Sequence, residues 1–308
     1  MSSITPTEGQ KKQFKRFVED AAERALKEVG LDKDGLQKLI ENGDEFQSRI
    51  IAGIRELSVS NQFADEEVKS NYTYPKEYEG PKPIEEQIKE IAKIFDLDPT
   101  RALEFAKNLP QIPEGAEGWF AIPSVNALAK KHFPEVQDSA ERYCRAIQLV
   151  HKKIAASRLF YNYREDQITP DHLRLNARTA HFLDLIAKIQ KADILIAPAQ
   201  LGMRHRGRSV RRTREVFTAN EFGGGSLAAG SIILTHPERL ARWEELDMDC
   251  PGDEFSPDAG GDFSSAPYFS FDEGEVGFGT SWFDDASSDC GSFSLFFPQE
   301  WNLENLEI

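Results

Sequence analysis

The last 66 residues of this sequence, from Trp243 to Ile308, contain no lysine and no arginine, although they hold seventeen Asp and Glu residues. The preceding residues carry all 37 basic residues and only 35 of the 52 acidic ones, so the net charge of −15 arises in this acidic region. A chain of such charge repels phosphate groups in general. The composition therefore argues against an ordinary basic nucleic-acid-binding protein, unless basic side chains gather in a local patch.

Cysteine and long apolar runs are scarce as well. Cys144, Cys250 and Cys290 lie far apart and form no CxxC pair, which is typical of a reducing compartment and not of a disulfide-stapled secreted protein. The longest weakly polar stretch, Ser226–Leu234, has about half the length that a membrane span requires, and no secretion signal precedes the first helical pattern. We therefore expect a cytoplasmic protein with no membrane partner.

Several catalytic and cofactor motifs are missing. The sequence holds no GxxxxGK[ST] phosphate loop, no HExxH or paired CxxC zinc motif and no GxSxG nucleophile turn. The run Gly223–Ala228 fits the GxGxxA spacing of a dinucleotide-binding loop, but that loop must lead from a strand into a helix. We interpret these glycines instead as the end of a preceding helix. The sequence thus predicts no cofactor.

The distribution of apolar residues predicts an α+β fold. Residues 1–70 and 84–190 follow the i, i+3, i+4, i+7 pattern of amphipathic helices. Residues 71–83, which hold three Pro and three Tyr, are expected to form an extended linker. Residues 191–308 are expected to form a mixed α/β and β-meander region that can pack as one domain with residues 84–190.

The first elements of this last region predict a βαβ unit. Ile194–Ala197 and Ser231–Leu234 are short apolar runs that indicate buried strands, and a helix is expected between them from about Ser209 to Asn220. After Trp243, short aromatic runs such as Tyr268–Phe271 alternate with turn residues. This alternation is typical of an antiparallel β-meander.

The highest density of positive charge lies between Arg204 and Arg214, which we call the arginine segment. It contains one histidine, His205, and six arginines: Arg204, Arg206, Arg208, Arg211, Arg212 and Arg214. If a helix begins near Ser209, cations crowd its first turns, where the helix dipole disfavours each of them by about 0.3–1 kcal/mol. A negative group should offset this cost: carboxylates of the acidic region, a phosphate-bearing partner held by guanidinium forks, or a protein partner.

The predicted βαβ unit indicates where a ligand would bind. Ligands gather outside the carboxyl ends of parallel strands, which would bring Gln200 and the arginine segment close to His236 and Glu238. Two histidines beside arginines could bind an anion and transfer a proton, so His205 and His236 are the candidate catalytic residues. Gln200 and the six arginines are the candidate anion-binding residues.

One stretch of the acidic region could bind a hard cation. Asp247, Asp249, Asp253 and Asp258 could supply oxygen ligands to Ca²⁺ or Mg²⁺. The stretch departs from an EF-hand loop, because Pro251 occupies its fifth position and Asp258 replaces the glutamate of its twelfth. A solvated acidic turn is the simpler interpretation, and we assign no metal.

Three strings resemble an uncharacterised bacterial protein family: ILIAPAQLGMRHRGRSVRRTRE, LTHPERL and DCPGDEF. The likeness extends from about Phe46 to Pro298. It implies a bacterial cytoplasmic origin, and it brings neither a fold nor a catalytic residue to this chain.

These observations favour a non-enzymatic protein that binds a polyanion, such as an RNA or DNA backbone, through phosphate contacts of the arginine segment. One alternative is an enzyme that acts on a small phosphorylated or carboxylated substrate at the C-terminal edge of the βαβ unit. Another is a scaffold in which the arginine segment pairs with the acidic C-terminal region or with a protein partner.

Overall fold

The computed structural model describes residues 7–58, 61–243 and 245–301. Residue 244 and residues 302–308 of the acidic region therefore lie outside the described residues. The chain divides into two compact units, Met1–Ser60 and Asn61–Ile308, which we call the helical unit and the body. Helices come first and antiparallel strands follow, so the predicted α+β class is confirmed.

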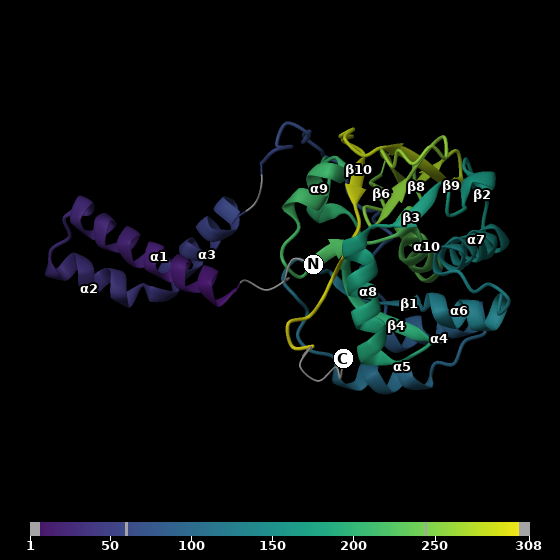
Figure 1. Cartoon of the computed structure of the whole chain (residues 1–308), viewed down its shortest axis with the longest axis horizontal. Coiled ribbons are helices and arrows are strands. Elements are labelled where there is room, and N and C mark those ends of the chain that lie inside the picture. Colours follow the sequence, from purple (N-terminus) through teal and green to yellow (C-terminus); the bar gives the residue numbers. More distant parts are fainter. Residues whose placement is uncertain (1–6, 59–60, 244, 302–308) are drawn as a thin grey trace. The chain divides into compact units, whose positions relative to one another are not determined.

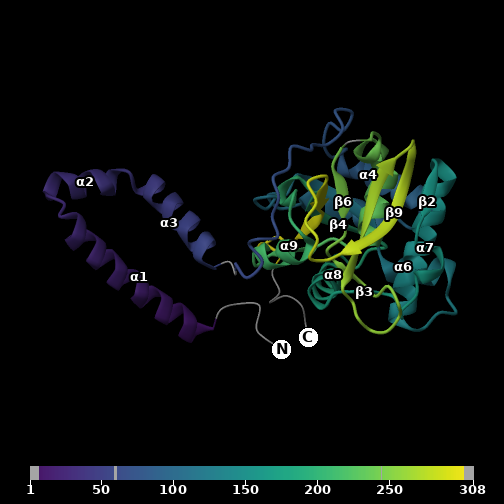
Figure 2. The ribbon, with the colours of Figure 1, turned by 90° about the horizontal axis from the view of Figure 1, so that it is seen from above.

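The helical unit contains three helices joined by short turns. These are α1 (Glu8–Val29), α2 (Lys33–Glu41) and α3 (Gly43–Ser58). Thr7 and Gln10 form a reciprocal capping box at the start of α1, and Gly30 ends the helix in the left-handed conformation at φ 62°. Figure 2 shows α1 and α3 as two separate arms connected through α2. No residue of α1 or α2 is buried.

The body begins with a long stretch that has no regular secondary structure. Residues 69–83 follow an extended path, drawn in blue in Figure 1, and the carbonyl oxygen of Thr73 accepts a hydrogen bond from the amide of Leu246. The helices that follow are α4 (Ile84–Phe95), α5 (Thr100–Phe105), α6 (Val125–His132), α7 (Ser139–Ser157), α8 (Ala177–Gln190), α9 (Val210–Val216) and α10 (Ser226–Thr235). Short 3₁₀ turns are η1 (Ala106–Asn108), η2 (Glu165–Gln167), η3 (Met203–His205) and η4 (Pro237–Leu240).

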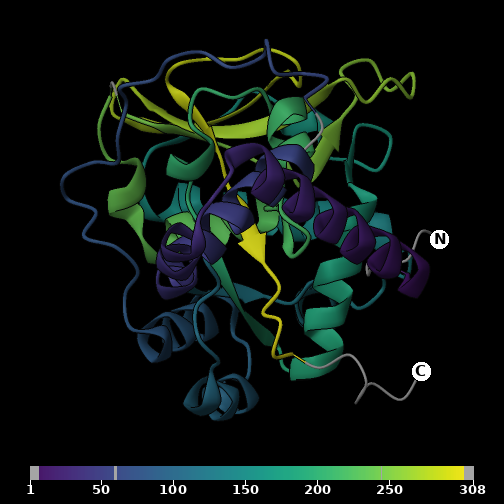
Figure 3. The same ribbon diagram turned by 90° about the vertical axis from the view of Figure 1, so that its left-hand side faces the viewer.

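The strands form two sheets. The first is wholly antiparallel, in the order β1 (Gly118–Pro123), β4 (Ile194–Gln200), β11 (Ser294–Phe296) and β5 (Glu221–Gly223). The main path of the second is β10 (Cys290–Ser292), β6 (Asp247–Asp249), β8 (Ser265–Asp272), β7 (Asp253–Phe255) and β3 (Leu173–Leu175). From this path β8 also pairs with β9 (Glu275–Trp282), which pairs with β2 (Phe160–Asn162). Figure 3 shows the yellow-green strands of the second sheet at the opposite end of the body from the blue helices α4 and α5.

Of the predicted β-meander, the described strands β7, β8 and β9 pair antiparallel in chain order, whereas β6 pairs with β8 and β10 runs parallel to β6. The connection between β8 and β9 is a hairpin. Its two-residue turn has positive φ at both positions, 48° at Glu273 and 90° at Gly274. This is the turn geometry that matches the natural twist of a hairpin, and glycine adopts it at little cost.

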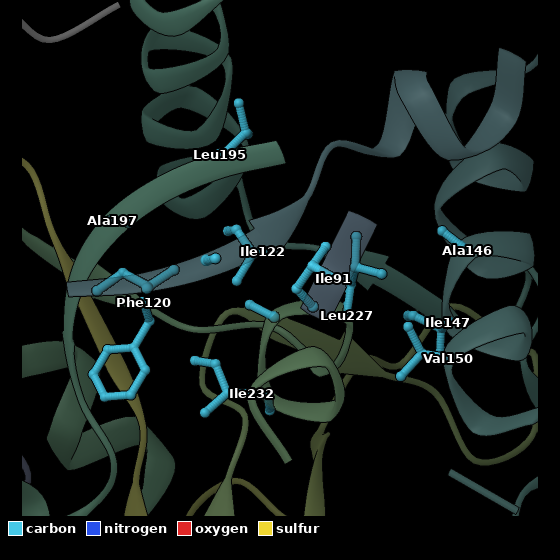
Figure 4. Close-up of a cluster of buried hydrophobic side chains, with 14 of the residues drawn as sticks. Ile91, Phe120, Ile122, Ala146, Ile147, Val150, Leu195, Ala197, Leu227 and Ile232 are labelled. Carbon is cyan, nitrogen blue, oxygen red and sulfur yellow. The ribbon is translucent and has the colours of Figure 1, made fainter. Parts of the chain in front are cut away.

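The core of the body surrounds α10. This helix is apolar on all sides and packs against α4, α7, β1 and β8, so it contacts both sheets. Figure 4 shows Leu227 and Ile232 of α10 among side chains of these neighbours, including Ile91, Phe120 and Val150.

The predicted βαβ unit is wrong. Its first strand and its helix correspond to β4 and α9, but Ser231–Leu234 lies inside α10. A short continuous apolar run fits a buried strand and a buried helix equally well, because neither has a polar face that would reveal the period. The unit therefore has no second strand, and β4 pairs only with antiparallel neighbours in the described residues.

The interpretation of the glycine run is wrong as well. Gly223 ends β5 and Ser226 begins α10, so the glycines lead from a strand into a helix. They permit close approach of other chain segments, since a Cβ at Gly224 would lie 1.9 Å from the Phe293 ring. The backbone amide at the start of α10 has no partner within the helix, but it is hydrogen-bonded: Ser226 N donates to Asp253 Oδ2 at 2.7 Å. An internal carboxylate thus fills the position where a phosphate would bind.

We predict that Gly224→Ala destabilises the body by about 3 kcal/mol, because the added methyl group overlaps the buried ring of Phe293. The measurement is urea unfolding of the full chain. Gly53→Ala is the matched control, since a Cβ at Gly53 in α3 meets no atom within 4 Å. Equal midpoints for both variants would contradict the close packing at Gly224.

Candidate functional site

The arginine segment runs from the end of β4 through η3 into α9. Ser209 caps α9, and its Oγ accepts a hydrogen bond from Arg212 N at 2.9 Å. Isolated bridges pair Arg206 with Gly291 and Arg208 with Glu67. The segment therefore lies between β10 of the second sheet and residues 61–70, and it covers the edge that β10 would otherwise expose.

The first two arginines of the segment have partners inside the body. Arg204 Nε lies 3.3 Å from Glu221 Oε1, and Arg206 Nη1 donates to the carbonyl oxygen of Tyr72 at 2.9 Å. Arg204 is the most exposed of these groups, with 34% of its side chain accessible.

The next arginines contact two glutamates that precede the extended stretch. Arg211 forms a two-pronged contact with Glu66, and Arg212 Nε donates to Glu67 Oε1 at 2.6 Å. Arg208 Nε lies 3.3 Å from the same Glu67 oxygen, and Arg212 also reaches Glu215 at 2.8 Å. Guanidinium forks of this kind are the strongest partners of carboxylates.

These contacts lower the pKa of both glutamates. The hydrogen bond from Arg211 is the main cause at Glu66. At Glu67 burial raises the pKa, but the hydrogen bond and the charge of Arg212, together with the charge of Arg208, outweigh it. Both carboxylates are therefore ionised at neutral pH and neutralise the segment.

Arg214 ends the segment in a buried position. Its guanidinium donates to the carbonyl oxygens of Pro251 at 2.9 Å and Asp253 at 2.7 Å, and burial lowers its pKa. The acidic region further contributes Asp284, whose Oδ2 lies 3.7 Å from Arg211 Nη2. Glutamates outside the acidic region thus supply carboxylate partners that the sequence analysis sought inside it.

His205 and Glu221 form a buried pair behind the arginine segment. His205 Nε2 and Glu221 Oε1 are 2.7 Å apart, and the side chains are 2% and 0% exposed. Arg208 Nη1 lies 3.1 Å from His205 Nδ1. Because a guanidinium only donates, Nδ1 must accept, and Nε2–H therefore donates to Glu221. Burial lowers the pKa of His205 despite the neighbouring carboxylate, so the imidazole is neutral.

The same carboxylate collects further donors. Ser294 Oγ donates to Glu221 Oε1 at 2.7 Å, and Gln200 Nε2 donates to Ser294 Oγ at 2.9 Å. Burial raises the pKa of Glu221, but the hydrogen bonds from His205 and Ser294 and the charge of Arg204 outweigh it, so the pKa is lowered. Gln200, Arg204, His205 and Arg208 are thus connected, as the sequence analysis expected, but around a carboxylate that neutralises them.

His236 belongs to a different network. It follows α10, with Nδ1 2.8 Å from Thr235 Oγ1, and its Nε2 accepts a hydrogen bond from Lys82 N at 3.0 Å. The rings of Tyr78 and Phe120 pack beside it, and burial lowers its pKa to about 4. Nearby Glu238 lies 3.9 Å from Lys82 Nζ. The expected pairing of His236 with His205 depended on the βαβ unit, and the described contacts do not connect the two rings.

The four candidate cation ligands are spread over three places. Asp247 and Asp249 share one face of β6, Asp253 lies under α10 with Tyr143 Oη 2.6 Å away, and Asp258 accepts from Gly260 N in a later turn. Among the described residues, no group of three or more His, Cys, Asp or Glu side chains could hold a metal ion. The three cysteines are free thiols.

Burial changes the titration of these carboxyl groups. It raises the pKa of Asp247 to about 8, of Asp249 to about 7 and of Asp253 to about 6. For Asp247 the nearby charges of Asp289 and Asp249 add to the effect. At these three residues desolvation outweighs the hydrogen bonds and attractions that favour the charged form, so the pKa of each carboxyl group is raised.

The residues that complete this site are Glu66, Glu67, Glu221 and Ser294, and the sequence analysis missed all of them. The adjacent pair Glu66–Glu67 was the only available signal. It lies more than a hundred residues before the arginines that it neutralises, so no local pattern connects them.

Comparison with protein-family models, with curated proteins and with solved structures found no match to this chain. None of the helices in the described ranges combines the length and the apolar character needed to cross a bilayer. The resemblance found in the sequence therefore stays a prediction.

We predict that Asp249→Asn stabilises the body increasingly as pH rises. The folded pKa of Asp249 is about 7 against 3.8 for the free group, so the native state holds a proton that the unfolded chain loses. The stability of the wild type therefore falls between about pH 4 and pH 7 by about 4 kcal/mol, and asparagine, which does not ionise, avoids this loss.

Urea unfolding at pH 5 and pH 8 measures this difference. Asp272→Asn, at an exposed position at the end of β8, is the control for the same chemical change. If Asp249→Asn were no more stabilising at pH 8 than at pH 5, the carboxyl group would be ionised throughout.

Proposed function

We propose that this protein is a non-enzymatic scaffold in which the arginine segment joins residues 61–70 to the rest of the body. The observation that supports it is the set of internal partners. Each guanidinium of the segment contacts a carboxylate or a backbone carbonyl of the same chain. Arginines that serve as a binding surface would instead point their donors toward solvent.

The strength of the internal contacts also supports this proposal. Arg212 is 9% exposed and bonds to Glu67 and Glu215, of which Glu215 is 6% exposed. A polyanion would have to displace these carboxylates and leave them without a counter-charge in a poorly hydrated place, which costs several kcal/mol. Burial also disfavours an enzyme at this position, because the side chains of His205 and Glu221 are too buried to reach a substrate.

We predict that Arg212→Gln destabilises the full chain by about 2–4 kcal/mol, because Glu67 and Glu215 both lose the charged hydrogen bonds of the Arg212 guanidinium. Arg242→Gln is the matched control, since Arg242 forms an exposed pair with Glu77 and should change stability little. Urea unfolding of both variants is the measurement. Adding Glu67→Gln to Arg212→Gln should recover part of the lost stability. If the destabilising effects of the two single substitutions simply add, the Arg212–Glu67 pair contributes no coupling energy.

We further predict that the wild type does not bind duplex DNA or structured RNA at about 50 mM salt, whereas Glu66→Gln/Glu67→Gln gains binding that weakens as salt rises. The glutamine pair removes the internal anions and frees Arg208 and Arg211. Salt-titrated fluorescence anisotropy measures both proteins.

The same measurement can also contradict the scaffold proposal. Wild-type binding with a log–log salt slope of roughly −2 to −4, lost in Arg208→Gln/Arg211→Gln/Arg212→Gln, would establish polyanion binding and overturn the scaffold.

A further inference from the structure

The helices of the helical unit expose many large apolar side chains that none of its described residues buries. In α1 the side chains of Phe14, Phe17 and Val18 recur with Leu26 and Val29 at helical spacing, and Phe17 is 72% exposed. The same holds for the later helices, where Ile40 is 64% exposed. The large apolar residues exposed in this unit are Phe14, Phe17, Val18, Leu26, Val29, Leu31, Leu36, Ile40, Phe46, Ile50 and Ile54.

The area of this face is large for a free surface. Taken together over the three helices, the exposed parts of these eleven residues amount to roughly 900 Å², more than the about 300–600 Å² of the largest apolar patch on an ordinary monomer. A standard protein–protein interface takes about 800 Å² from each partner. If a partner brings the three helices together, they hold enough exposed apolar area for one side of such an interface.

The helix ends are well specified, although α1 and α2 bury no residue. Thr7 caps α1, Asp32 caps α2 through Gly35 N at 2.7 Å, and Gly30 closes α1. An isolated helix as short as α2, which has nine residues, is marginal in water, and amphipathic helices gain most of their stability by burying the apolar side. Well-formed caps beside an uncovered apolar side indicate helices that complete their packing against another surface.

The net charge of the helical unit indicates which partner surface covers its apolar residues. Met1–Ser60 carries ten Lys and Arg residues and eleven Asp and Glu residues, so it is close to neutral, whereas the rest of the chain carries 27 and 41. Two copies of the body repel each other, but two helical units can meet without such a penalty. A near-neutral surface also offers no attraction to a polyanion or to an anionic membrane.

We propose that a second copy of this chain covers the apolar face, so that the helical units of two chains pair in a single helical bundle. The occupant is a second helical unit, because it supplies an apolar face of the same area and the same absence of net charge. This association goes beyond the scaffold role of the arginine segment and depends on different residues. It would give the scaffold two bodies held through one bundle.

The test is the mass of the full chain in solution, measured by sedimentation equilibrium over a series of concentrations. We expect a dimer for the wild type. Phe14→Ser/Phe17→Ser should raise the dissociation constant about tenfold or more, because it removes two large apolar contacts from the pairing face. Lys12→Ser/Arg16→Ser is the matched control, since these positions lie on the opposite side of α1, and it should leave the dissociation constant within about twofold.

Circular dichroism at the same concentrations provides the second measurement. If pairing completes the fold of the unit, helix content should fall on dilution in the phenylalanine variant before it falls in the wild type. A wild type that is monomeric at every concentration would overturn the proposal. So would a dimer that both double variants weaken equally. Neither result would affect the effect of Arg212→Gln on the stability of the body, so the scaffold role is tested separately.

Discussion

Six guanidinium groups within eleven residues repel one another, and the fold of the body depends on how that repulsion is offset. Glu66 and Glu67 supply the counter-charges, so residues 61–70 are drawn against α9 and the edge of β10 is covered. Removing water from several like charges is tolerated only where each finds a charged or carbonyl acceptor. The irregular start of the body is thus held by charge and not by an apolar core of its own.

The same constraint recurs at other buried polar groups. Arg239 is fully buried and donates to the carbonyl oxygens of Leu201 and Leu246. Asp253 occupies the start of α10, which would otherwise be suited to a phosphate. Places where positive potential could attract a ligand are occupied by groups of the chain itself. The buried charged groups of the body are therefore paired with acceptors or donors of the same chain.

The two units differ in how they use apolar surface. The body buries a continuous core around α10, between strands of both sheets and the helices α4 and α7. The helical unit has apolar residues at the same helical spacing but buries none in α1 or α2. An interaction protein needs such a division, because a stable core holds the fold while an uncovered face remains for a partner.

The sequence by itself determined the α+β class and the aromatic strands of the β8–β9 hairpin, because each depends on a local period or on turn residues. It also identified the arginine segment as the point of highest charge. Tertiary structure alone decided that Ser231–Leu234 is helical, since an apolar run shows no period when every side is buried. It alone decided which carboxylates meet the arginines, because Glu66 and Arg211 are 145 residues apart and only the folded chain brings them together.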